Sequence, residues 1–183
     1  MIYFDIILFG ADYMLYATIG TLTLNNFVYN RDNLENLYFL KKLTKDKEVK
    51  KRFQGLSNIL SNKNNNFFGQ GFIVKDKEKY IGYIHIGDIN YKENCVYLIS
   101  AIDKDLRGIS YGKTLLNEIT EYIFINYPNI TNIRLKIDSD NKPSLKAADS
   151  CGYKWLERDF YKKDNPYIKL DKPKILKKSY INV

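Results

Sequence analysis

The chain has 183 residues, of which 45% are hydrophobic and 27% charged, the balance of an ordinary soluble domain. Its 10 Phe, 16 Tyr and single Trp supply enough apolar surface to exclude a disordered chain. Two cysteines, Cys95 and Cys151, and one histidine, His85, exclude a disulfide scaffold and argue against a metal site or a Ser-His-Asp triad.

The net charge is +8, from 29 Lys and Arg against 21 Asp and Glu. Only five of the basic residues are Arg, and the lysines are spread through a chain equally rich in Asn, Ile and Tyr. We therefore attribute the charge to compositional bias and do not expect nucleic acid as a partner, although a polyanionic small ligand would still be attracted. Asp5 and Asp12 interrupt the apolar N-terminus, so we expect no signal peptide, no membrane span and a cytoplasmic location.

The N-terminal third predicts short strands followed by two helices. Residues 1–20 read as an extra hairpin, and 21–27 as a strand with Leu22 and Leu24 directed inward. A helix follows from Arg31, with Asn30 or Asp32 as its N-cap and a second helix over about 46–60. The apolar stripe of the first helix is expected to hold Leu34, Leu37, Tyr38 and Leu40, and that of the second Val49, Phe53, Leu56 and Leu60.

The middle of the chain predicts a hairpin and then a buried strand. Residues 67–74 and 80–89 flank a charged turn at 76–79 and read as two paired strands. Residues 95–102 are almost all apolar, which is typical of a strand buried on both faces.

The C-terminal part predicts a helix at 110–127 that Pro128 ends, a strand at 130–137, a short helix at 143–151, and two last strands at 153–158 and 167–170. The long helix carries its apolar residues on one side: Tyr111, Leu115, Leu116, Ile119, Tyr122 and Ile123. A basic tail without a clear period follows from residue 172. Because no internal repeat is present, we predict one domain over residues 1–183, of mixed α+β type.

The segment 101–113 is the candidate site. A buried strand ends there, a short loop with Gly108 and Gly112 follows, and an amphipathic helix begins at once. Glycine lets the backbone approach a ligand closely, and the free N–H groups of a helix start bind anions. Arg107 and Lys113 add positive charge, although a plain turn between strand and helix fits the same features. The glycine spacing is neither that of a P-loop nor that of a dinucleotide fold.

The loop sequence Arg-Gly-Ile-Ser-Tyr-Gly at 107–112 resembles the Arg/Gln-x-x-Gly-x-Gly/Ala pyrophosphate loop of the GNAT superfamily of acyl-CoA N-acyltransferases. Ser110 stands where that family usually has its middle Gly; Ser is small and a good N-cap, but it makes the approach of a coenzyme more crowded. The block from Asn141 to Tyr153 is similar to the family's Asn-x-x-Ser/Ala segment that ends in Gly-Phe/Tyr. Residues 22–24, two helices and 46–49 resemble the subgroup that acts on ribosomal-protein N-termini, and the likeness covers roughly 21 to 170.

The resemblance implies a GNAT fold, with a mixed, mostly antiparallel central sheet, about four helices, and two splayed strands that admit the pantetheine arm of acetyl-CoA. Backbone groups of Ala101 and Ile102 would hold that arm, and an N–H near Ile102 would polarise the thioester carbonyl. Asn141 would meet the arm at the start of the second helix, with Ser144 beside it. The pyrophosphate would lie on the backbone amides of the loop: Arg107, Gly108, Ile109, Ser110, Tyr111, Gly112 and Lys113.

The implied reaction is direct attack of a neutral amine on acetyl-CoA, which needs a base for the ammonium and an acid for the thiolate. Many relatives use a Tyr as the acid, but the matching position here is Ala148. Ser144 occupies the position of a Ser suggested for that role in the ribosomal-protein subgroup; alternatively it caps the helix. The Glu that relatives carry near Val96 or Tyr97 is missing. The remaining base candidates, each also readable as a solvated or structural residue, are Asp88, Glu93, Tyr97 and His85.

Our first hypothesis is therefore an acetyl-CoA-dependent N-acetyltransferase for a primary amine, such as a peptide N-terminus, a polyamine or an amine-bearing antibiotic. No acidic cluster occurs in 31–60 or 88–94, which argues against polyamines and aminoglycosides. One alternative is a catalytically weak or inactive GNAT-like domain that binds acyl-CoA; another is an RNA- or ribosome-associated module that uses the Lys-rich segments 41–52 and 169–178. Homodimers are common among such proteins, and nothing in these residues shows one.

Overall fold

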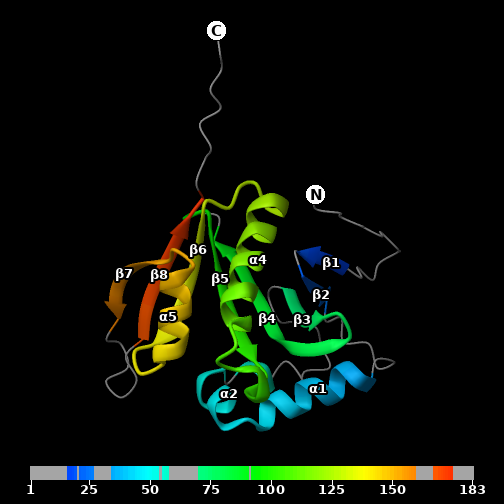
Figure 1. Cartoon of the computed structure of the whole chain (residues 1–183). Helices are drawn as coiled ribbons and strands as arrows, with labels where there is room; N and C mark the ends of the chain where they lie inside the picture. Colours follow the sequence, from blue (N-terminus) through cyan, green and yellow to red (C-terminus); the bar gives the residue numbers. More distant parts are fainter. Residues whose placement is uncertain are drawn as a thin grey trace.

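The computed structural model describes residues 16–19, 21–26, 34–53, 55–57, 70–90, 92–159 and 167–174 (Figure 1). Its strands are β1 (Tyr16–Ile19), β2 (Leu22–Asn26), β3 (Gln70–Asp76), β4 (Lys79–Asn90), β5 (Cys95–Ile102), β6 (Asn132–Asp138), β7 (Lys154–Asp159) and β8 (Tyr167–Pro173). Its helices are α1 (Leu34–Lys45), α2 (Lys47–Arg52), α4 (Tyr111–Asn126), α5 (Lys142–Ser150) and the 3-10 turn η1 (Lys104–Leu106).

The strands form one eight-stranded sheet in the order β1-β2-β3-β4-β5-β6-β8-β7. Every neighbouring pair is antiparallel except β5 and β6, which run parallel. Parallel neighbours need a crossover connection, and α4 supplies it. The predicted mixed, mostly antiparallel sheet with a few helices is confirmed.

Helices cover both faces of the sheet. Because alternate strand residues point to opposite faces, the same strand contributes side chains to two separate cores. Phe72 and Ile84 belong to the core under α4 and α5, whereas Ile73 and Tyr83 belong to the core under α1 and α2. In Figure 1, α4 crosses the front of the sheet, and α1 and α2 lie below it.

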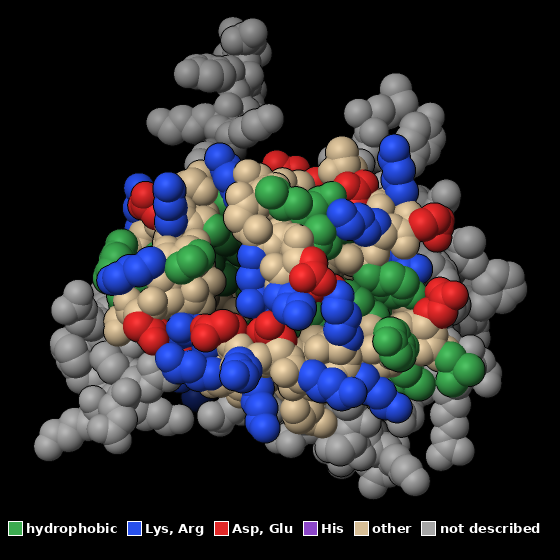
Figure 2. All heavy atoms as spheres, turned by 60° about the horizontal axis from the view of Figure 1, so that its bottom comes forward, with side chains coloured by type: hydrophobic (Ala, Val, Ile, Leu, Met, Phe, Trp, Pro, Cys, Tyr) green, Lys and Arg blue, Asp and Glu red, His purple; other side chains and the backbone are tan. Residues whose placement is uncertain are grey.

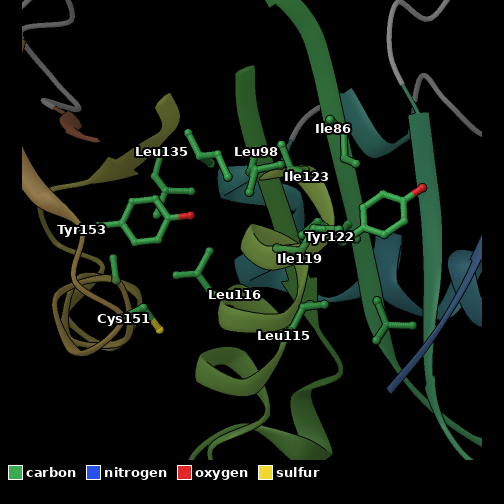
Figure 3. Close-up of a cluster of buried hydrophobic side chains, with 14 of the residues drawn as sticks. Ile86, Leu98, Leu115, Leu116, Ile119, Tyr122, Ile123, Leu135, Cys151 and Tyr153 are labelled. Atoms are coloured by element: carbon green, nitrogen blue, oxygen red, sulfur yellow. The ribbon is translucent and has the colours of Figure 1, made fainter. Parts of the chain in front are cut away.

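The larger core is built on α4, whose apolar side packs on the middle of the sheet (Figure 3). The predicted inward residues of this helix are buried, apart from Tyr111, which is only half-buried. The hydroxyls of Thr120 and Tyr153 lie 2.8 Å apart in a buried hydrogen bond. This pair joins α4 to the segment that follows α5.

The smaller core under α1 corrects one prediction. Leu34 and Tyr38 are 73% and 76% exposed, and the buried residues are Phe39, Leu40 and Leu43. Around the helix, positions 34 and 38 lie about 120° and about 160° from position 40, so the predicted stripe mixed two faces. In the second helical stretch Val49, Phe53 and Leu56 are buried as predicted, but α2 ends at Arg52, and residue 60 lies outside the described residues.

Three boundaries also differ from expectation. β1 pairs with β2, whereas the rest of the predicted hairpin in residues 1–20 lies outside the described residues, as do both N-cap candidates of α1. The turn between β3 and β4 has two residues, Lys77 and Glu78, instead of four, with φ of 53° at Lys77. β8 continues through Pro173, so the first two residues of the predicted tail belong to the sheet.

Candidate active site

The parallel strands β5 and β6 separate halfway along their length. They pair only from Cys95 opposite Asn132 to Leu98 opposite Leu135. Beyond Leu98, β5 stays paired with β4, and beyond Leu135, β6 stays paired with β8. The expected splay is therefore present, and the facing edges of the two strands are open where they part.

Strand alternation decides which backbone groups face this gap. The Asp103 amide donates to the Ile81 carbonyl at 2.9 Å, so alternate residues along β5 are bonded to β4. An added Cβ at Gly82 would lie 2.3 Å from the Ala101 carbonyl oxygen, which places that carbonyl against β4 as well. The N–H and C=O groups of Ser100 and Ile102 consequently point into the gap.

This differs from the expectation for Ala101, whose backbone groups face β4 and whose side chain packs under α1 and α2. Ser100 has the orientation that was expected of Ala101. Because backbone groups alternate along a strand, the neighbours Ala101 and Ile102 cannot both face the gap, whereas Ser100 and Ile102 can. Ile99 is 44% exposed and Ser100 is exposed too, so β5 is not buried on both faces along its whole length. The exposure begins where β6 diverges.

The loop before α4 has a left-handed backbone at two positions. Gly108 has φ of 83° and Ser110 has φ of 71°. The family's usual glycine at the position of Ser110 is explained by this conformation, which costs a residue with a Cβ about 1–2 kcal/mol. Ser110 is the N-cap of α4, but contrary to expectation its side chain makes no capping hydrogen bond, because its backbone is not extended.

The start of α4 is therefore an open cradle of donors. The first amides of a helix have no partner inside it, and the Ser110 side chain supplies none. A Cβ at Gly108 would meet nothing within 4 Å, and one at Gly112 would meet only the Ile102 side chain, at 3.9 Å. Glycine leaves free space at both positions, and the amide donors with the positive end of the helix dipole suit a pyrophosphate there.

Arg107 turns its side chain away from that cradle. Its Nε donates to the Ile102 carbonyl at 3.1 Å, and its Nη2 pairs with Asp46 Oδ1 at 2.9 Å. Ile109 and Lys113 are exposed beside the loop. The Tyr111 hydroxyl donates to Asp76 Oδ2 at 2.9 Å; this hydrogen bond raises the pKa of Tyr111 and ties the first turn of α4 to the end of β3.

The second block of the sequence lies at the start of α5. Asn141 is its N-cap, with Oδ1 accepting from the Ser144 amide at 3.4 Å. The alternative interpretation of Ser144 as the capping hydroxyl is therefore wrong. Ser144 stands in the first turn, half-buried, and Ala148 is fully buried in the core.

The base candidates lie in different surroundings. Tyr97 sits on the paired half of β5, where Arg134 Nη1 donates to its hydroxyl at 3.4 Å. Glu93 is half exposed and pairs with the same Arg134 at 2.6 Å, and Asp171 binds that guanidinium through both oxygens. His85 is buried beside the Tyr83 hydroxyl, opposite Ile99 in the next strand. The side chain of Asp88 lies outside the described residues.

Two negative findings concern the described residues. They contain no group of three His, Cys, Asp or Glu side chains placed to hold a metal ion. No helix among them is both long and apolar enough to cross a membrane.

Residues 32–153 match the sequence model of the acetyltransferase (GNAT) family. Among curated proteins, no sequence matches the chain. Among solved structures, spermidine N-acetyltransferase from Vibrio cholerae in complex with CoA and spermine has a TM-score of 0.68 at 18% identity over 84% of this chain and 95% of its own.

Two further solved structures are similar. A putative ribosomal-protein-serine acetyltransferase from Vibrio cholerae gives 0.68 at 18% identity, over 87% of this chain and 98% of its own. The RimL ribosomal L7/L12 α-N-protein acetyltransferase gives 0.70 at 11% identity, over 92% and 99%. At these identities the structures show the common fold, and the match over residues 32–153 shows the family. With its splayed strands and open helix start, this chain belongs to the acetyltransferase (GNAT) family, whose members transfer the acetyl group of acetyl-CoA to an amine.

Proposed function

We propose that this chain acetylates a primary amine that carries a single positive charge, such as a peptide N-terminus or a small monoamine. The amine enters from the α1 and α2 side of the splayed strands and attacks acetyl-CoA directly. The observation that carries this proposal is the pair of gap-facing amides, Ser100 and Ile102, in the strand whose following loop leads to the uncapped start of α4.

In this proposal the coenzyme lies along β5. Its pyrophosphate binds the amides from Arg107 to Lys113, where Gly108 and Gly112 leave free space. The pantetheine arm continues into the gap and hydrogen-bonds the backbone of Ile102 and then of Ser100, in the place of a missing strand. Asn141 meets the arm from the start of α5.

The same amides assist the chemistry. As the amine adds to the thioester carbonyl, negative charge develops on the oxygen, and a gap-facing N–H stabilises it. Because the arm passes Ile102 before Ser100, the thioester at its end lies nearer the Ser100 amide, and we assign the role to this amide in place of the Ile102 amide that the family resemblance implies. Fixed donors of this kind contribute roughly 3–4 kcal/mol of transition-state stabilisation in other enzymes.

Two proton transfers complete the reaction. Ser144 is the proposed acid for the departing thiolate: it stands beside Asn141, and its hydroxyl has no hydrogen-bond partner within the described part of the chain. Tyr97 is the proposed base that takes the proton from the ammonium of the acceptor. Arg134 holds its hydroxyl on the face of the sheet that carries α1 and α2. His85 lies on this face too, so the pH dependence of the rate in Tyr97→Phe and His85→Asn variants decides between them.

The charge arrangement favours a singly charged acceptor. At the open end of the strands, Asp138 and Asp140 pair with Arg52, and on the paired half, Asp171 and Glu93 pair with Arg134. A polyamine needs carboxylates that remain available for its second ammonium group, whereas an amine with one charge does not.

The test is release of free CoA thiol from acetyl-CoA in the presence of N-terminal peptides, monoamines and spermidine. We expect turnover with a peptide or monoamine, and a Ser144→Ala variant with kcat lowered about 10- to 100-fold at an unchanged KM for acetyl-CoA. A clear preference for spermidine would overturn the proposed acceptor class. Binding of acetyl-CoA without transfer to any amine would favour the inactive alternative.

A further inference from the structure

Helix α2 is joined by ion pairs to the end of each splayed strand. At its N-terminus, Asp46 Oδ1 lies 2.9 Å from Arg107 Nη2, and Arg107 Nε donates to the carbonyl of Ile102, the last residue of β5. Asp46 also caps α2 by accepting from the Val49 amide at 2.9 Å. One end of α2 is thereby connected to β5.

The other end of α2 is connected to β6. Arg52 Nη1 lies 2.9 Å from an oxygen of Asp138, the last residue of β6, and 2.6 Å from an oxygen of Asp140. Its Nε pairs with Glu48 on the same helix, and Lys51 pairs with Asp140 at 2.9 Å. A single helix thus spans the open end of the two strands that part after Leu98.

These pairs are partly shielded from water. The side chains of Arg52 and Asp138 are each 18% exposed and that of Asp46 is 14% exposed, so they are screened less than ordinary surface pairs. Burial would raise the pKa of Asp46, but the hydrogen bonds from Arg107 and the Val49 amide lower it below its usual value. Arg52 and then Lys51 hold the pKa of Asp140 below its usual range.

The length of α2 suits this position. Six helical steps separate Asp46 from Arg52, a rise of about 9 Å at 1.5 Å per residue. Two strands with one extended chain between them lie about 9.6 Å apart, twice the spacing of neighbouring strands. Figure 2, which brings the α1 and α2 end of the molecule forward, shows acidic and basic side chains gathered beside a hollow in the surface.

We propose that α2 is a clasp that sets the width of the gap between β5 and β6 for the pantetheine arm, with Arg52 and Asp46 as positioning residues. The inference rests on the proposed function, because the arm must enter that gap. It does not apply to the phosphate cradle, which is formed by the loop before α4.

The test compares two ligands by calorimetry. Coenzyme A contains the arm, whereas adenosine 3′,5′-diphosphate keeps phosphate groups but lacks the arm. Breaking the clasp with Arg52→Gln should weaken binding of coenzyme A roughly tenfold, and binding of the diphosphate less than twofold. Asp46→Asn should weaken coenzyme A in the same selective way, because Asn caps a helix as well as Asp but cannot form the ion pair.

Two further variants act as controls. Lys50→Gln removes a charge from an exposed position on α2 but none of the ion pairs that join α2 to the two strands, so both ligands should bind as to the wild type. Arg52→Lys keeps the charge but not the planar fork, so affinity for coenzyme A should be only partly restored. The clasp is refuted if Arg52→Gln leaves both affinities unchanged. It is also refuted if the variant weakens both affinities equally, because that result would show a merely structural role for Arg52. A wild type that binds no coenzyme A refutes the proposed function itself.

Discussion

Glu118, on α4, holds its carboxylate against the turn between β1 and β2. Oε1 accepts from the Thr21 amide at 3.4 Å, and Oε2 is buried without a hydrogen-bond partner in the described part of the chain. Burial raises the pKa of this carboxyl, and the nearby Glu121 adds to the effect. An acid whose folded pKa is raised binds its proton more tightly in the folded chain. Stability is therefore lost as the pH rises from the ordinary value through the raised one.

Replacing this charge with a neutral amide should stabilise the protein at neutral pH. Glu118→Gln keeps an oxygen for Thr21, and we expect its melting temperature to exceed that of the wild type by up to about 2 °C at pH 7.5, after allowance for solvent screening. At pH 4 the wild-type carboxyl is largely protonated, so the difference should shrink. Thermal unfolding at both pH values checks this, and a difference that grows toward pH 4 would contradict it.

Single residues show what the sequence could and could not predict. The position of Ser144 beside Asn141 followed from the motif, but Asn141 as the helix cap became visible only in the structure. Arg107 was predicted beside the phosphate loop, and its side chain instead reaches Asp46, 61 positions away. Local patterns predict where a residue lies along the chain, whereas the partner of a long charged side chain depends on packing between distant segments.

At the scale of elements, the loop before α4 stores backbone strain at Ser110. A Gly there adopts the left-handed conformation without a Cβ penalty, so Ser110→Gly should stabilise the protein by about 1 kcal/mol. In a domain of this size that raises the melting temperature by about 2–4 °C. Acetyl-CoA should bind at least as tightly, because the backbone can approach the phosphates more closely.

Ser139→Gly is the matched control, since Ser139 is not among the positive-φ residues of the described chain. It should leave the melting temperature unchanged or lower it. Equal stabilisation by both variants would show that the effect does not come from the left-handed backbone at Ser110.

Elements with strong periodicity were predicted closely, and α4 is the best example, because its buried side is continuous from Leu115 to Ile123, about two and a half turns. The apolar stripe of α1 was predicted less well, because this helix carries apolar residues on more than one face. Its packing on β3 and β4 decides that Phe39, Leu40 and Leu43 are the buried ones. The end of α2 at Arg52 was also missed, although basic residues in its last turn and Gly55 three positions later are signals of a helix end.

At the scale of the whole molecule, the order of strands and the splay decide the function. The sequence predicted the sheet and the open strands only through a family resemblance, since periodicity does not reveal the register between β5 and β6. The register shows that they part after Leu98 and Leu135. The ion pairs at both ends of α2 connect residues 61 to 89 positions apart, and no local pattern indicates them.

The central claim is that acetyl-CoA binds along β5 with its pyrophosphate on the first turn of α4. The most direct test is calorimetry of acetyl-CoA with the wild type and with Gly112→Trp, whose side chain enters open space next to Ile102 and fills the cradle. The control Asn129→Trp places the same bulk beyond the other end of α4. We predict micromolar binding by the wild type and the control, and none by Gly112→Trp with an unchanged circular dichroism spectrum. Equal binding by all three proteins, or no binding by a folded wild type, would contradict the account.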